Sequence, residues 1–342
     1  MPEVAGDGPV FYDAELQSRA RLVRRSFAHL NAMMVDWTAD FDRVVMHTAG
    51  PGDSGTWFMV DVAGHSAVQL GYDRPAIGSA MVGPSSMVNY TAADGLELDG
   101  VLTLPPGGQS TGLPLIVLPH GGPQAHDEVG FDWWAQAFAS RGYAVFQPNF
   151  RGSTGRDEAF VRLGFGQWGR AMQTDISDGV AWLAEQGTID PARACIVGAS
   201  YGGYAALAGV TVQQGLYRCA VSVAGVSDIA LMYDTDNRES GRNRTLRVSL
   251  QEEFGPRGGW AEVSPRRLAA RADAPILLIH GRDDTVVPFQ QTAVMADALE
   301  DAGKPHQVVE LASEDHWLSR SETRIQMLRA TMDFVLEHNP PD

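Results

Sequence analysis

A serine flanked by glycines, Ser200, stands between a short apolar run and a helix-forming stretch, in the order Gly198-Ala199-Ser200-Tyr201-Gly202. A strand that turns sharply into a helix crowds the backbone at the turn, so the flanking residues must be small if the serine Oγ is to project into solvent. The pattern therefore predicts a strand, a tight turn and a helix in this order, which is a nucleophile elbow. The positive end of the helix and the backbone N–H of Tyr201 would face the place where a carbonyl oxygen becomes an oxyanion.

Acidic and histidine residues follow two later strand-like runs. Asp283 and Asp284 come after the apolar run 276–279, and His316 comes after the run 307–311, in a loop with Glu314 and Asp315. Only one of the two adjacent aspartates can aim at a histidine, and the acids beside His316 would raise its proton affinity. The chain order Ser, Asp, His is the order of α/β-hydrolases, whereas chymotrypsin-like and subtilisin-like proteases use other orders. The non-catalytic alternatives are that Ser200 is a serine packed at a strand end and that His316 is a solvated surface histidine.

Strand-like and helix-like segments alternate from about residue 113, which predicts βαβ crossovers and a mostly parallel sheet with helices on both faces. The predicted strands are 115–118, 143–147, 194–197, 219–223, 276–279 and 307–311, and the predicted helices are 131–140, 172–185, 204–213, 290–301 and 321–337. Residues 87–104 read as antiparallel strands that lead into this sheet. Residues 1–85 read differently, as a β-meander with strands near 10–12, 32–35, 43–46 and 56–62. We therefore expect two domains, 1–85 and 86–342, the second with an α/β-hydrolase fold.

The composition narrows the classes of partner. The formal net charge of −16 disfavours nucleic acid and anionic membranes, and no apolar stretch approaches the roughly 20 residues that span a bilayer. Cys195 and Cys219 both lie in apolar runs and are predicted to be buried thiols, which together with a start that does not resemble a secretory signal predicts a cytoplasmic protein. His120 and His280 end core strands and read as structural histidines. With no metal-ligand spacing in the sequence, we expect no metal or other cofactor.

Four ordered motifs resemble the catalytic domain of the prolyl oligopeptidase family of serine peptidases, in its acylaminoacyl-peptidase and dipeptidyl-aminopeptidase-like branch. The motifs are residues 118–123 (LPHGGP), 149–155 (NFRGSTG), 198–204 (GASYGGY) and 280–288 (HGRDDTVVP). The resemblance covers roughly residue 87 to the end. It implies that Ser200, Asp284 and His316 are nucleophile, acid and base, and that the N–H groups of Tyr201 and Gly122 form an oxyanion hole. Trp317 stands where the family often has glycine and would narrow the site.

The resemblance also suggests a substrate pocket. Val226, Ile229, Met232 and Tyr233 occupy the positions of an acyl or side-chain pocket, with a simple core role as the alternative, and their apolar character suggests a medium-sized hydrophobic group. Arg151 is a candidate for a substrate carbonyl or for a structural salt bridge. The expected substrates are short peptides or acyl-aminoacyl compounds. The alternative substrates are short-chain esters, which would make the protein a carboxylesterase. Two further hypotheses are an acyltransferase and a non-catalytic binding module.

The first 85 residues are too few for the β-propeller that caps the active site in this family. They would supply at most two blades, and a closed propeller needs at least four. The resemblance therefore implies a chain that has lost most of its propeller or is a fragment of a longer one, with the meander as a partial lid. Unclosed strand edges and apolar residues such as Trp57, Phe58 and Met59 would then favour self-association through this region.

Overall fold

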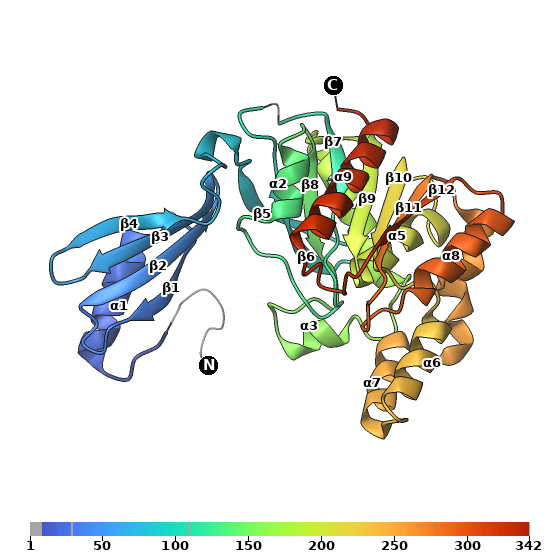
Figure 1. Ribbon diagram of the computed structural model, residues 1–342, viewed down its shortest axis with the longest axis horizontal. Coiled ribbons are helices and arrows are strands. Elements are labelled where there is room, and N and C mark those ends of the chain that lie inside the picture. Colours follow the sequence, from blue (N-terminus) through green and yellow to red (C-terminus); the bar gives the residue numbers. More distant parts are fainter. Residues whose placement is uncertain (1–8, 29, 109, 342) are drawn as a thin grey trace.

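Two separate β-sheets organise the chain in a computed structural model that describes residues 9–28, 30–108 and 110–341. The first is a four-stranded sheet in the order β1-β2-β3-β4, and the second is an eight-stranded sheet in the order β12-β11-β10-β9-β7-β8-β6-β5. The two sheets lie side by side in Figure 1, with the N-terminal unit in blue beside the larger α/β unit. The last strand of the first sheet ends at Tyr72 and the first strand of the second begins at Ser85.

The N-terminal unit consists of one helix packed on an antiparallel sheet. Its elements are α1 (Ala14–Ser26), β1 (Ala32–Trp37), β2 (Arg43–Gly50), β3 (Asp53–Asp61) and β4 (Ser66–Tyr72). The meander prediction missed α1, and the strand predicted at 10–12 is wrong. The helical signal was present, because Asp13 caps the helix by accepting from two backbone amides, and Leu16, Ala20, Val23 and Phe27 are spaced along one helix face.

The α/β unit is built on a mostly parallel sheet. Two antiparallel strands, β5 (Ser85–Thr91) and β6 (Glu97–Thr103), join its edge, and β6 pairs antiparallel with β8. The remaining neighbours pair in parallel, and all six strands predicted beyond residue 113 occur: β7 (Leu113–Val117), β8 (Ala144–Asn149), β9 (Ile189–Ala199), β10 (Cys219–Val223), β11 (Ile276–Gly281) and β12 (His306–Leu311). The parallel pairing aligns the carboxyl ends of these strands along one edge.

Helices cover both faces of the larger sheet. On one face, α2 (Trp133–Ala139) and α9 (Ser321–His338) pack with Ile116 and its neighbours, and Figure 1 shows both helices in front of the strands. On the other face, α4 (Ala171–Glu185), α5 (Tyr201–Thr211) and α8 (Gln290–Asp301) pack with Leu115 and Val117. Successive strand residues point to opposite faces, so one continuous apolar run supplies both cores.

Several short helices were not predicted. They are α3 (Glu158–Arg162), α6 (Ile229–Glu239), α7 (Arg244–Phe254) and the 3₁₀ segments Ser79–Met81, Arg257–Gly259, Ala261–Val263 and Pro265–Arg271. Asp228 caps α6 and Asn243 caps α7, each by accepting hydrogen bonds from two backbone amides at the start of the helix. These two helices form the hairpin that extends away from the sheet in Figure 1.

The two cysteines form a disulfide between β9 and β10, so the prediction of two separate thiols is wrong. Cys195 and Cys219 are direct partners in the parallel register, with their Cα atoms 4.8 Å apart. The two residues are 24 positions apart in sequence, and only the crossover through α5 makes their strands neighbours. The prediction of a cytoplasmic, reducing location rested partly on free thiols, and the disulfide removes that argument.

Within the part of the chain that the structure describes, none of the helices combines the length and the apolar character that crossing a bilayer requires.

Candidate active site

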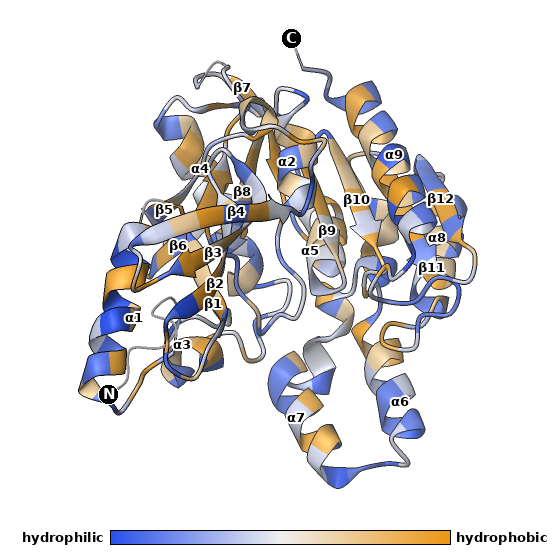
Figure 2. Ribbon diagram, turned by 60° about the vertical axis from the view of Figure 1, so that its left-hand side comes forward, coloured by the Kyte–Doolittle hydropathy of each residue, from blue (hydrophilic) through white to orange (hydrophobic). Residues whose placement is uncertain are grey.

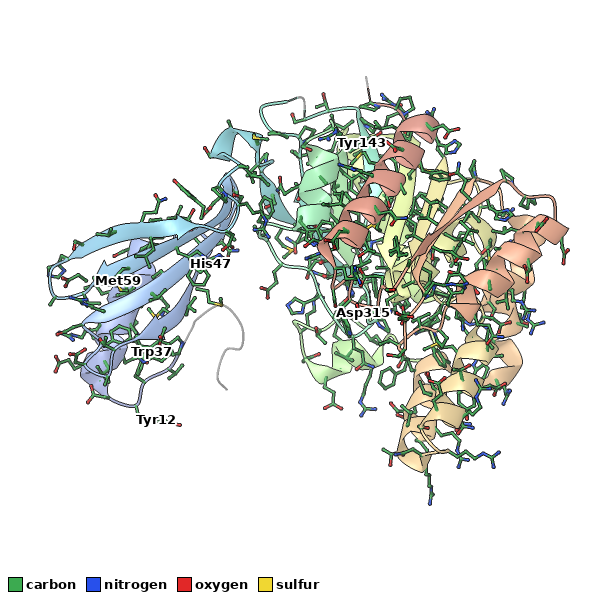
Figure 3. The ribbon with its side chains drawn as sticks, viewed as in Figure 1. Tyr12, Trp37, His47, Met59, Tyr143 and Asp315 are labelled. Atoms are coloured by element: carbon green, nitrogen blue, oxygen red, sulfur yellow. A yellow bond between two sulfur atoms is a disulfide. The ribbon has the colours of Figure 1, made fainter. Side chains whose placement is uncertain are left out.

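The predicted nucleophile, acid and base all follow strands at the carboxyl edge of the parallel sheet. Ser200 follows β9, Asp284 lies in the loop after β11, and His316 lies in the loop after β12. Figure 3 shows the direction of the sheet, because Tyr143, which precedes β8, and Asp315, which follows β12, lie at opposite edges of the α/β unit. In open α/β sheets this carboxyl edge is where ligands bind.

Ser200 sits on a strained turn between β9 and α5. Its backbone has φ 58° and ψ −121°, a left-handed φ that costs a non-glycine residue energy and is typical of functional turns. The flanking glycines are required by close packing: a Cβ at Gly198 would lie 2.4 Å from the backbone of Gly202, and a Cβ at Gly202 would lie 2.1 Å from the carbonyl oxygen of Pro119. The steric reason given for the motif therefore holds in the structure.

Asp284 is the aspartate that meets the histidine. Its Oδ2 accepts a hydrogen bond from His316 Nδ1 at 2.7 Å, whereas the neighbouring Asp283 is exposed. Its Oδ1 accepts from the backbone amides of Val286 and Val287, each at 2.8 Å. The structure thus selects one of the two adjacent candidates, and both carboxylate oxygens have partners.

The charge of Asp284 is strongly favoured. Burial by itself would raise the pKa of this carboxyl, but the hydrogen bonds from His280 and His316 and the positive charge of protonated His316 outweigh it and hold the pKa well below its ordinary value. His280 Nε2 lies 3.2 Å from Asp284 Oδ2 and 2.8 Å from the carbonyl oxygen of Val287, and its Nδ1 contacts Thr292 Oγ1 at 2.8 Å. His280 is therefore a fully bonded structural histidine that supports Asp284.

His316 is nearly enclosed, with 7% of its side chain exposed. Its Nδ1 is committed to Asp284, which leaves Nε2 for a second partner. In the part of the chain that the structure describes, no hydrogen bond joins this imidazole to Ser200. The Trp317 ring meets the imidazole edge-on at 5.4 Å, and the residue is 75% exposed.

The acids beside His316 hold the loop. Glu314 is fully buried, and its carboxylate accepts from the amides of Asp315, Ser319 and Arg320 and from the hydroxyl of Thr323. Asp315 accepts from the amide of Trp317 and from Ser319. Both carboxylates are thus bound to this loop, and Glu314 also joins it to the start of α9, an arrangement that the sequence did not reveal.

The predicted oxyanion donors lie on two segments that meet at Ser200. Tyr201 is the first residue of α5, where backbone N–H groups have no partner within the helix. A Cβ at Gly121 would lie 3.4 Å from Ser200 Cβ, so the glycine loop (residues 120–123) lies close to Ser200, and Gly122 follows with φ 115°. Two sets of backbone amides thus flank the serine from different elements.

Arg151 forms a structural salt bridge. Its guanidinium donates to both oxygens of the buried Asp175, at 2.8 and 2.7 Å, and contacts Asp94 at 2.8 Å. Its backbone N–H also donates to Asp175 at 2.9 Å. The structure favours the salt bridge over the role in binding a substrate carbonyl.

The predicted pocket residues are part of the hydrophobic core. Val226, Ile229, Met232 and Tyr233 are all buried and belong to the same core cluster as Tyr201 and Trp168. They come from the segment after β10 and from the first turns of α6. Their burial fits the core role, and their role as walls of an acyl pocket stays a prediction.

The remaining predicted features are structural. His120 Nε2 contacts Ser153 Oγ at 2.9 Å and its Nδ1 contacts the carbonyl oxygen of Gly121 at 2.8 Å, while burial lowers its pKa to about 4. His120 therefore stays neutral and buttresses the glycine loop. Across the described ranges, no three histidine, cysteine or acidic side chains gather in a way that would hold a metal ion.

A model of the prolyl oligopeptidase family matches residues 129–340, which is more than half of the chain and includes all three candidate catalytic residues. The chain belongs to the prolyl oligopeptidase family. Similar curated proteins are dipeptidyl aminopeptidase BIII of Pseudoxanthomonas mexicana, 28% identical over 96% of this chain and 54% of the relative, and human acylamino-acid-releasing enzyme, 26% identical over 67% of this chain and 32% of the relative. Among solved structures, a puromycin hydrolase is 26% identical with a TM-score of 0.77, over 89% of this chain and 47% of that one.

These relatives of the prolyl oligopeptidase family establish the fold of the larger unit, which is an α/β-hydrolase fold preceded by an antiparallel sheet. The chain spans about half the length of the dipeptidyl aminopeptidase and of the puromycin hydrolase. Sequence reasoning missed Glu314 and Thr323 as supports of this family site, and it placed His280 in the core without linking it to Asp284. The four-residue spacing from His280, by which the resemblance favours Asp284 over Asp283, was the available signal for their contact.

Proposed function

We propose that this chain is a serine hydrolase that cleaves acyl bonds through Ser200, His316 and Asp284. The observation that carries the proposal is the 2.7 Å hydrogen bond between His316 and Asp284, at the sheet edge where Ser200 is held on a strained turn. A buried aspartate bound to the imidazole on one side and a nucleophilic hydroxyl on a tight elbow are the two halves of a catalytic triad. Membership of a family of serine peptidases supports the same chemistry.

In this mechanism, Asp284 accepts the Nδ1–H of His316 and so fixes the tautomer that leaves Nε2 unprotonated. Ser200 Oγ bonds to the acyl carbon while its proton passes to Nε2. The carbonyl electrons move to the oxygen, which receives hydrogen bonds from the N–H groups of Tyr201 and Gly122. The tetrahedral intermediate collapses, the leaving group takes the proton from Nε2, and water then releases the acyl group by the same steps in reverse order.

The substrate class that we propose is a short peptide or an acyl-aminoacyl compound. Its support is the similarity to a dipeptidyl aminopeptidase and an acylamino-acid-releasing enzyme. Short-chain esters are the second candidate, because an ester is more reactive than an amide and needs fewer remote contacts to orient it. Comparing aminoacyl p-nitroanilides with p-nitrophenyl butyrate separates the two: robust anilide cleavage supports the peptidase, and ester cleavage alone supports the carboxylesterase.

The experiment that tests the proposal is the substitution Ser200→Ala. We expect turnover to fall by at least about 10⁴-fold, because removing the nucleophile leaves only binding and the oxyanion donors. Labelling by a fluorophosphonate probe should also be lost, while the circular dichroism spectrum and melting temperature stay close to those of the wild-type chain. Full activity in the variant would contradict the proposal, and a wild-type chain that the probe does not label would favour a non-catalytic binding module.

We also propose that copies of the chain associate through the N-terminal unit. Its sheet carries α1 on one face only, and the other face presents Met33 and Val68, which are 59% and 63% exposed. Figure 2 shows the hydrophobic stretches along β2, β3 and β4.

A further inference from the structure

The loop that carries His316 is strained on both sides of this residue. It runs from the end of β12 at Leu311 to the start of α9 at Ser321. Ser313 and Leu318 have φ angles of 54° and 52°, a left-handed backbone that residues other than glycine adopt at a cost. Such strain persists only where surrounding contacts hold the backbone in place, so this loop needs a restraint.

The side chain of Glu314 supplies this restraint. One carboxylate oxygen, Oε1, accepts hydrogen bonds from the backbone amides of Asp315 and Ser319, each at 2.9 Å. The other, Oε2, accepts from the amide of Arg320 at 3.3 Å and from the hydroxyl of Thr323. These bonds close the loop around the histidine, because one of the bonded amides precedes it and the other two follow it.

The same carboxylate anchors the loop in the core of the α/β unit. Glu314 is fully buried, and its bonds to the residues around the start of α9 place its negative charge at the positive end of this helix. Arg320 occupies the N-cap position of α9 but makes no capping hydrogen bond with its side chain, so Glu314 provides the cap from the preceding loop. Met327 and Val335 of α9 are buried in the core against the sheet, which makes the helix a fixed support.

The backbone of Glu314 holds the loop of the catalytic acid. Its carbonyl oxygen accepts a hydrogen bond at 3.0 Å from the amide of Asp283, the residue before Asp284. A Cβ at Gly281, the last residue of β11, would lie 2.4 Å from the same oxygen, so the two loops are in close contact. Glu314 therefore joins the loop of Asp284 and the loop of His316 to the start of α9.

Resting on the proposed function, we propose that Glu314 is a positioning residue, which holds the His316 imidazole at the distance from Ser200 that proton transfer requires. Asp284 fixes the imidazole at Nδ1, and in the described part of the chain no hydrogen bond holds Nε2. The distance from Nε2 to Ser200 Oγ therefore depends on the backbone of this loop. A displacement of about 1 Å between reacting groups can lower a rate by about 10²-fold.

The test is a double-mutant cycle with His316. We expect Glu314→Ala to lower kcat for a p-nitrophenyl ester by about 10²-fold and to change KM less than about threefold, because the side chain orients the base without touching the substrate. In the His316→Ala background, the same substitution should lower the residual Ser200-dependent rate by less than about threefold. A residue that acts only through the imidazole has nothing left to position in that background.

A conservative variant should restore most of the activity. Glu314→Gln keeps Oε1 as an acceptor for the two amides, and its NH₂ group can donate to the Thr323 hydroxyl, which itself donates to the carbonyl oxygen of Arg320 at 2.9 Å. Only the longer bond from the Arg320 amide is lost, so we expect kcat within about fivefold of wild type. Glu314→Asp withdraws the carboxylate by one methylene and repeats the cycle should Glu314→Ala not fold, with an expected loss of about tenfold in kcat.

Two controls separate positioning from a loss of stability. Glu310→Ala removes the same group from an exposed site on β12 and should leave kcat within about twofold of wild type. Leu183→Ala opens a cavity under α4 and should lower the melting temperature while kcat per folded molecule, measured below that temperature, stays within about twofold.

Equal losses from Glu314→Ala in the wild-type and His316→Ala backgrounds would overturn the positioning role and leave the proposed function standing. The same conclusion would follow if folded Glu314→Ala kept a kcat within about twofold of wild type. Full activity in Ser200→Ala would instead refute both.

Discussion

The Asp284 carboxylate has four protein partners, and they assign its two oxygens to different tasks. Oδ1 binds two backbone amides of its own loop, whereas Oδ2 faces the two histidines. The two backbone amides fix the orientation of the carboxylate, and the two histidines interact with its negative charge. A single buried side chain thus links the loop after β11 to the loop after β12.

Replacing this residue by its amide tests that role. Asp284→Asn keeps the shape but offers His316 Nδ1 an amide N–H, so the imidazole would be held in the wrong tautomer, and we expect kcat to fall by about 10⁴-fold at pH 7. Asp283→Asn, at the exposed neighbouring position, should stay within about twofold of wild type, since surface substitutions have small effects. Steady-state hydrolysis of one ester by the two variants shows which aspartate supports the histidine. A large loss of kcat in Asp283→Asn alone would assign that role to Asp283 instead of Asp284.

Asp127 is a residue whose ionisation should oppose folding. Burial first, and then the charge of Asp132, raises its pKa to about 7, and its Oδ2 is buried without a partner. A carboxyl whose pKa is higher in the folded than in the unfolded chain stabilises the fold below its unfolded pKa, and that contribution is lost as pH rises from about 4 to about 7. Asp127→Asn should therefore raise the free energy of unfolding at pH 8, by up to about 4 kcal/mol, and flatten its dependence on pH across this window.

Urea unfolding of wild type and Asp127→Asn at several pH values between 4 and 8 measures this effect. Glu252→Gln removes the same formal charge from an exposed site and controls for the change in net charge. If Asp127→Asn and Glu252→Gln shift the unfolding midpoints equally at pH 8, the burial of Asp127 does not destabilise the folded chain at this pH.

At the scale of elements, the strand–turn–helix unit of β9 and α5 depends on how closely it packs on the glycine loop. A Cβ at Gly202 would lie 2.1 Å from the carbonyl oxygen of Pro119, which is backbone and cannot rotate away. We expect Gly202→Ala to displace the loop that carries Gly121 and Gly122, lowering kcat by about 10²-fold or more through loss of oxyanion stabilisation. Gly78→Ala is the control, because nothing lies within 4 Å of its Cβ position and its φ is negative. A Gly202→Ala variant as active as Gly78→Ala would show that the close approach is not needed.

The β9–β10 pair is covalently joined, and this joint should stabilise the sheet. A disulfide that closes a loop of this length restricts the unfolded chain and contributes about 3 kcal/mol in the chain-entropy model. We expect no free thiol when the chain is denatured without reductant and two after reduction, with a lower melting temperature for the reduced protein. The double variant Cys195→Ala, Cys219→Ala should melt with the reduced form and should not respond to reductant. Two free thiols in the untreated denatured chain would contradict the disulfide.

Some elements are predictable from the sequence and others are not, for physical reasons. The bounds of β10 and α8 agree with the prediction at both ends, because a parallel strand buried on both faces is a continuous apolar run and an amphipathic helix has a regular period. The α6–α7 hairpin was missed because much of both helices is polar, so their apolar residues do not mark a clear helix face. Glu314 looks like a solvated acid in sequence, and only the fold brings the amides of Ser319 and Arg320 to its carboxylate. The positions of Ser200, Asp284 and His316 were predictable because each follows a strand, whereas the pairing of Cys195 with Cys219 depends on strand order.

At the scale of the whole molecule, the N-terminal unit has one covered and one open sheet face. Phe58 packs against Phe27 of the covered side at 5.4 Å, and Trp57 packs against His47 at 4.6 Å and donates a hydrogen bond to Asp73. The sequence-based choice of Phe58 and Trp57 as residues without neighbours is therefore wrong. Trp57 and Met59 alternate with Phe58 and lie on the other face with Val68, which pairs with Met59 across the strands. Figure 3 shows Met59 on this sheet, away from the α/β unit. The open face is therefore continuous across strands, as an interface between two sheets requires.

We expect the chain to self-associate at micromolar concentration through this face, and the association should strengthen with salt, because two copies that each carry a net charge of −16 repel each other at low ionic strength. Val68→Lys places a charge in the middle of the face and should give a monomer in sedimentation velocity. Gln69→Lys adds the same charge one residue along β4, where the side chain points to the opposite face, and should leave the association intact. A wild-type chain that sediments as a monomer at both low and high salt would exclude this interface, and equal disruption by the two lysine variants would mean that charge, rather than the apolar face, controls the assembly.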